Sequence, residues 1–159
     1  NIKGSCKFNS DVKVDYLKVF GEANFNKNMF RSTEVRVYGD MKVNVLESDN
    51  IYIRGKITCD NEINGDKIKI ASYGGSVIKE LLGTEIIIKP KKRYFLFKVK
   101  KQTIIDTIEA DNIYLENVVS KAVRGNNITV GPNCRIDKVE YRDSYVNKTK
   151  RGVKECEKY

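Results

Sequence analysis

Histidine and tryptophan are absent from the 159 residues of this chain, and proline occurs only twice. Without histidine, general acid–base or nucleophilic catalysis would depend on carboxylates or lysine. No pair of acidic residues stands out for such a role, because the candidates lie near expected turns, where solvated side chains are the ordinary finding. These candidates are Asp49, Asp60, Asp66, Asp111 and Glu116. The sequence therefore predicts no catalytic residues and favours a protein that is not an enzyme.

Cysteine is sparse and scattered, and the residues Cys6, Cys59, Cys134 and Cys156 include no C-x-x-C pair. A zinc site would need clustered ligands, so we expect neither a metal nor a cofactor. Cys6, Cys59 and Cys134 fall at inward positions of the repeat described below, which indicates small buried thiols. Free thiols are typical of a reducing compartment, so the predicted location is the cytoplasm. A run of about 18 apolar residues and a signal-peptide pattern are both missing, hence we expect no transmembrane helix.

What the sequence does contain is a repeated pair of alternating apolar residues. The pairs are Leu17/Val19, Val35/Val37, Ile51/Ile53, Ile68/Ile70, Ile86/Ile88, Ile113/Leu115 and Ile128/Val130. The first five pairs follow one another at steps of 18, 16, 17 and 18 residues, and Gly4, Gly21, Gly39 and Gly55 keep a similar spacing. A regular period of this length is the signature of a repeat architecture, in which each unit stacks on the next.

Alternation with a period of two predicts β-strands, because successive side chains point to opposite faces. We expect strands of about three residues that end at Gly, Asn or Asp, which readily accept a positive φ at a corner. A coil of about 17 residues has a perimeter of about 56 Å, which fits three short sides. The sequence thus predicts an all-β, three-sided parallel β-helix of about eight coils, each bonded to the next by a parallel ladder. An antiparallel sandwich, which also has short alternating strands, is the alternative.

A basic segment interrupts the repeat. Lys89–Lys101 carries seven positive charges and no acid, in a chain whose net charge is +9. The step from Ile86 to Ile113 is 27 residues, so an insertion belongs here, and Tyr94–Val99 is predicted to form a strand. We divide the chain into coils at 1–88, a basic aromatic insertion at 89–107, and coils with a polar tail at 108–159. The residues predicted to contact a membrane or another polyanion are Lys91, Lys92, Arg93, Phe95, Phe97, Lys98, Lys100 and Lys101.

The pattern resembles the bactofilins, a family of polymer-forming bacterial cytoskeletal proteins. The resemblance rests on the Gly-cornered repeat of residues 4–88, on Glu109–Val118, and on the blocks Val123–Cys134 and Ile136–Tyr141, which are similar to the longer variants of Gram-positive bacteria. It implies a right-handed β-helix whose subunits join end to end into filaments without nucleotide. It also implies a scaffold for cell-envelope or motility proteins, often at the inner face of the membrane.

Three functions are compatible with these observations. The first is a self-assembling scaffold whose partner is another copy of the chain, in a filament or a head-to-head dimer. The residues predicted to form that polymer interface are Ile2, Cys6, Phe8, Val146, Val153 and Cys156. The second is a membrane- or polyanion-binding module that acts through the basic insertion, with nucleic acid disfavoured because no specific motif supports it. The third is a carbohydrate-active or acyl-transfer β-helix enzyme, which the missing histidine and acid cluster disfavour.

Overall fold

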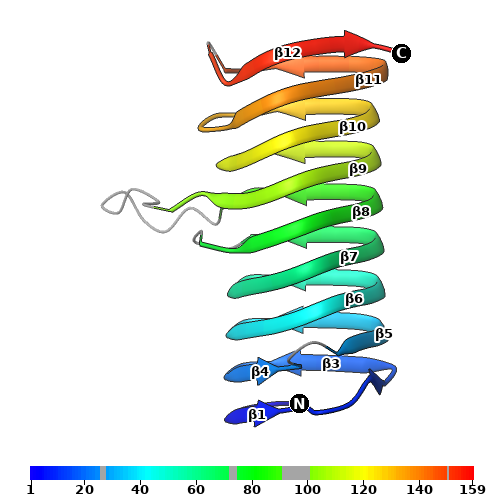
Figure 1. The fold of residues 1–159 in the computed structure, drawn as a ribbon, viewed down its shortest axis with the longest axis vertical. Coiled ribbons are helices and arrows are strands. Elements are labelled where there is room, and N and C mark those ends of the chain that lie inside the picture. Colours follow the sequence, from blue (N-terminus) through cyan, green and yellow to red (C-terminus); the bar gives the residue numbers. More distant parts are fainter. Residues whose placement is uncertain (26–27, 72–74, 91–100, 150) are drawn as a thin grey trace.

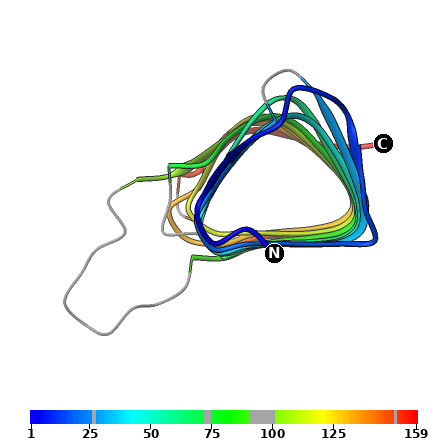
Figure 2. The same ribbon diagram turned by 90° about the horizontal axis from the view of Figure 1, so that it is seen from below.

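The chain forms a right-handed solenoid of about eight turns, with parallel strands and a triangular cross-section (Figures 1 and 2). This architecture comes from a computed structural model that describes residues 1–25, 28–71, 75–90, 101–149 and 151–159. No helix occurs among them, and none of these segments could therefore span a bilayer as an apolar helix. The predicted all-β, three-sided parallel β-helix is confirmed.

Twelve strands make up one sheet that winds around the axis. The strands are β1 (Ser5–Lys7), β2 (Val12–Lys13), β3 (Tyr16–Val19), β4 (Glu22–Asn24), β5 (Met29–Val37), β6 (Asp40–Ile53), β7 (Lys56–Ile70), β8 (Val77–Ile88), β9 (Thr103–Leu115), β10 (Val118–Val130), β11 (Arg135–Asn147) and β12 (Val153–Lys158). Each pairing between them is parallel, so the antiparallel sandwich is wrong for the described part of the chain.

The register stacks the apolar pairs of the repeat directly above one another. Ile51 pairs with Ile68, Ile68 with Ile86, Ile86 with Ile113, and Ile113 with Ile128. All five side chains are buried, at 4 % exposure or less, and the columns from the three sides fill one continuous core. The two copies of Asp-Asn-Ile-Tyr thus lie on the same side of the rod, as the repeat predicted. One coil buries little apolar surface alone, so stability depends on contact between neighbouring coils.

Strand length is where the prediction failed. Instead of strands of about three residues, β6 to β11 are 12 to 15 residues long, because two corners of each coil are turned without breaking the ladder. The bend is absorbed by register shifts such as the one between Val43 and Val45. A bulge of this kind redirects a strand while the hydrogen bonds on either side persist.

The corner glycines also have a different reason from the one predicted. Gly21, Gly39 and Gly55 do not adopt a positive φ, which the described residues show at Gly75, Asn117 and Asn133. A Cβ atom on Gly39 would instead lie 1.9 Å from the carbonyl oxygen of Gly21, well inside van der Waals contact. Glycine is required there because the backbones of successive coils approach too closely for a side chain.

From β7 to β10, the strands end at this same corner. Ile70, Ile88, Leu115 and Val130 occupy equivalent positions in successive coils, and each precedes a connection at that corner. The basic insertion is the longest, and β9 resumes the coil at Thr103 rather than at residue 108. The predicted boundary at 107 was therefore too late. Ile86 and Ile113, which mark the 27-residue step, both lie inside paired strands, so the residues between them include parts of β8 and β9 as well as the insertion.

Candidate functional site

The two ends of the solenoid present strand edges that no other described strand pairs with. At the N-terminal end, β1 pairs with β4 on one edge, and no described strand covers its other edge. At the C-terminal end, β12 covers Ile136–Tyr141 of β11, while Ser144–Asn147 lie beyond its reach. Such edges carry free N–H and C=O groups that can pair with another chain.

The N-terminal end exposes part of the aromatic core. The ring of Phe8 is half-buried and stacks on Phe25 at 4.5 Å between centroids, and Phe25 contacts Phe30 at 4.9 Å. Cys6 pairs with the buried Ala23, so it points toward the core, yet it is exposed because no described strand lies below it. The prediction that Cys6 is buried was therefore wrong. Ile2 is 8 % exposed, because its backbone bonds to Lys18 and Phe20 and closes the first coil.

The C-terminal end is more polar. Val153 and Cys156 continue the buried columns of Ile136 and Val139, and they are half-buried and exposed respectively. Val146 belongs to the last turn but pairs with Thr129 on the outer surface, so it faces sideways and is 48 % exposed. Four of the six residues predicted for the polymer interface thus point toward the core from a terminal coil that no described strand covers. These four are Cys6, Phe8, Val153 and Cys156.

The base of the basic insertion is held by hydrogen bonds to neighbouring coils. The Asn117 side chain donates to the Lys101 carbonyl at 3.0 Å, and Gln102 donates to the Asn133 carbonyl at 2.6 Å. From the other side, the Gly75 N–H donates to the Gln102 carbonyl at 3.2 Å. These bonds fix the point at which the chain re-enters the coil, and they leave the Lys101 side chain exposed.

The other residues predicted to contact a membrane or polyanion lie outside the described residues. They are Lys91, Lys92, Arg93, Phe95, Phe97, Lys98 and Lys100. The predicted strand Tyr94–Val99 also lies outside the described residues.

Beside this corner lies a cluster that the sequence analysis missed. Glu116 was interpreted as a solvated turn residue, but its side chain is only 13 % exposed and forms an ion pair with Lys89 at 3.5 Å. The hydroxyl of Tyr114 donates to the Glu116 carboxylate, and this hydrogen bond, with burial as a smaller cause, raises the pKa of Tyr114 to about 12. Lys89 and Lys148 lie 5.6 Å and 5.8 Å from the Tyr114 ring. The alternation Tyr-x-Glu, in which both side chains face outward, was the signal available in the sequence.

The titratable side chains of the described residues form no cluster suited to metal binding. In the described portion, no three His, Cys, Asp or Glu side chains are grouped so that they could hold a metal ion. Burial raises the pKa of the Cys59 thiol to about 11 and raises that of Cys134 as well. A thiol with a raised pKa is a poor nucleophile at neutral pH, so these two residues act as small core side chains.

Comparison with known proteins gives relatives without an assigned activity. The chain is 39% identical over 80 residues to the uncharacterized protein YhbF of Bacillus subtilis strain 168, covering 50% of this chain and 34% of that protein. It is 33% identical over 87 residues to the uncharacterized protein YhbE of the same strain, covering 52% and 37%. The matches thus span little more than a third of either relative's length. No family model and no solved structure matches.

Proposed function

We propose that this chain is a structural scaffold that self-assembles end to end into filaments without nucleotide. The observation that supports the proposal is the pair of uncovered coil ends, above all Phe8 stacked on the core at the N-terminal end. An unpaired strand edge beside an open apolar core favours addition of another strand, since both backbone hydrogen bonds and burial are gained. Such filaments would position cell-envelope or motility proteins, at the inner face of the membrane.

The test is electron microscopy of the purified chain by negative stain. We expect Phe8→Arg and Val153→Arg each to shorten or abolish filaments, because a charge at the end cannot enter a stacked core. Ile104→Arg is the matched control, since Ile104 is 47 % exposed on the side of the rod, away from both ends. Filaments of unchanged length in both end variants, with folding verified by circular dichroism, would contradict the proposal.

A second candidate function is binding of an anionic membrane through the basic insertion. It is supported by the seven positive charges of Lys89–Lys101 and by the hydrogen bonds that fix the insertion's base. Each lysine or arginine near an anionic surface contributes about 1 kcal/mol. We expect the chain to co-sediment with vesicles that contain acidic lipid and to be released by salt. Co-sedimentation that is indifferent to both salt and lipid charge would contradict this function.

A further inference from the structure

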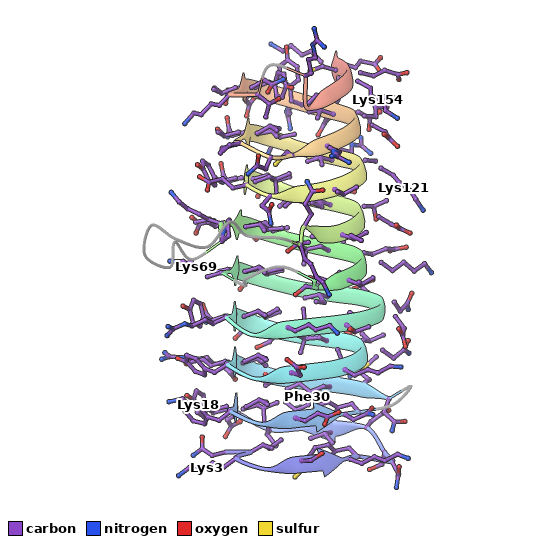
Figure 3. All side chains as sticks on the ribbon, turned by 90° about the vertical axis from the view of Figure 1, so that its left-hand side faces the viewer. Lys3, Lys18, Phe30, Lys69, Lys121 and Lys154 are labelled. Carbon is purple, nitrogen blue, oxygen red and sulfur yellow. The ribbon has the colours of Figure 1, made fainter. Side chains whose placement is uncertain are left out.

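One side of the rod carries a groove that neither end-to-end assembly nor the basic insertion uses. We define the tyrosine face as the outward side chains on the side that runs through Tyr16–Phe20, Glu34–Tyr38 and Asn50–Arg54 and continues at Lys67 and Lys69. Lys18 and Lys69 mark this face in Figure 3, where both lie on one flank of the rod and Lys121 and Lys154 lie on the other. A hollow of about 700 Å³ lies on it, across three successive coils.

Two tyrosine rings line the groove at a fixed angle. Tyr38 and Tyr52 meet edge to face, with ring centroids 6.0 Å apart. Phe20 stacks on the far side of Tyr38 at 5.2 Å, and the ammonium of Lys18 lies over both of these rings. Rings held in place by their neighbours lose little freedom when a ligand stacks on them, so the groove is preorganised.

Some charged side chains in the groove form ion pairs and others do not. Glu34 is bonded by Arg36, so its negative charge is compensated within the protein. Lys67 and Lys69 are exposed, and neither forms an ion pair with another described residue. Two unpaired ammonium groups at one wall of a groove provide a site for negative charge.

We propose that the tyrosine face binds an anionic oligosaccharide, a chain of sugar rings that carry carboxylate or phosphate groups. Flat sugar faces would stack on Tyr38 and Tyr52, while Lys67 and Lys69 would bind the acidic substituents. The side chain of Asn50, also at the groove, supplies the donors and acceptors that hydroxyl groups need. Coils repeat every ~4.8 Å, about the length of one sugar ring, so an extended chain along the axis meets equivalent positions in turn.

A nucleic-acid strand is the competing ligand, because bases also stack on aromatic rings. The hydrogen-bonding groups of the groove favour sugar. Besides its cations the groove holds the Asn50 amide and the Glu34 carboxylate, which accept hydrogen bonds from hydroxyl groups. Each sugar ring offers such hydroxyl groups, whereas an internal deoxynucleotide has none. The proposal is independent of filament formation, since the groove lies on the side of one subunit and away from both ends.

Isothermal titration calorimetry at low salt tests the proposal with three probes: tetragalacturonate, neutral cellotetraose and a ten-residue oligothymidylate. We expect tetragalacturonate to bind more tightly than either of the others. Lys69→Gln should weaken it about tenfold, as loss of a charge-assisted hydrogen bond does, and Tyr52→Ala at least about fivefold. Lys56→Gln is the matched control, because Lys56 is an exposed lysine of the same strand β7 that lies outside the groove.

Three results would overturn the inference. One is tetragalacturonate binding that the control weakens as much as Lys69→Gln does. The second is tighter binding of oligothymidylate or equal binding of cellotetraose, which would assign the groove to nucleic acid or to neutral sugar. The last is no heat of binding for tetragalacturonate with the folded protein at millimolar ligand. Because Lys69 is exposed and outward-facing, Lys69→Gln tests the groove without depending on the core.

Discussion

Replacing Gly39 with alanine should destabilise the solenoid far more than the same change at Gly4. The new Cβ atom on residue 39 would lie 1.9 Å from the Gly21 carbonyl oxygen, whereas nothing lies within 4 Å of a Cβ on Gly4. The clash is with backbone, so no side chain can rotate away, and the two coils must separate by about an ångström to restore contact.

The size of the effect follows from the hydrogen bonds at that corner. Tyr38, Gly39 and Asp40 donate to the coil below at 2.7, 3.3 and 2.9 Å. Each such bond contributes about 1 kcal/mol net, so separating the coils locally costs about 3 kcal/mol. Gly4→Ala should stay within about 0.5 kcal/mol, as surface substitutions do.

Equilibrium unfolding in urea, followed by far-ultraviolet circular dichroism, measures both variants against the parent chain. Hydrogen exchange adds a local readout, because a solenoid can lose its end coils before the rest. We expect Gly39→Ala to lower protection mainly in the first three coils. Unfolding free energies for the two variants that agree within about 0.5 kcal/mol would refute the argument that close approach of the coils selects glycine.

Three further outcomes follow from the side chains. At pH 8 a thiol reagent should label the two exposed cysteines rapidly, and Cys59 and Cys134 only after unfolding. Burial raises the pKa of both buried thiols and also hinders access of the reagent. Rapid labelling of four thiols in the folded protein would contradict the burial of these two. The folded-state pKa of Tyr114 is raised from 10.0 to about 12, so its stabilising effect is complete below pH 10 and lost as pH rises through 12. The difference in unfolding free energy between the parent chain and Tyr114→Phe should accordingly shrink over that window, and a constant difference would argue against the hydrogen bond to Glu116. Asn117 adopts a φ of 60°, so Asn117→Ala should cost more than Asn117→Gly in a thermal melt, by about 1 kcal/mol, and the reverse order would contradict this conformation.

The stacking of coils could be predicted because pairs of apolar residues recur at a regular spacing. Ile51, Ile68, Ile86 and Ile113 recur at the same phase, and the parallel register places them in one buried column. Successive side chains that point alternately into the core and into solvent give a periodic pattern of apolar residues, whatever the exact length of the strand. The core was therefore visible in the sequence.

The lengths of the strands and the role of the glycines were not visible in the same way. Whether a coil turns a corner inside a strand depends on hydrogen bonds to the coils on both sides, which a single repeat does not encode. The sequence shows a glycine at position 39, but it does not show whether that glycine is needed for a positive φ or for the close approach of two backbones. The exposure of Cys6 depends on what lies below the first coil, and phase alone says nothing of that.

The groove on the tyrosine face was missed for a related reason. Tyr38, Tyr52 and Lys69 are separated by most of a coil in the sequence, and each reads singly as a solvated outward residue. They become neighbours only when the register between β5, β6 and β7 is known. Surface sites on a solenoid run across the coils, so they are invisible to any window shorter than several repeats.

The corner at which successive coils connect has a geometrical consequence for a polymer. Ile70, Ile88, Leu115 and Val130 end their strands at the same corner of the triangular rod, so one edge of the rod differs from the other two (Figure 2). If subunits join along their axis without rotation, these edges line up along the fibre and repeat about every 40 Å, the height of about eight turns. A molecule that binds this edge on several subunits would detect both the direction of the fibre and its straightness.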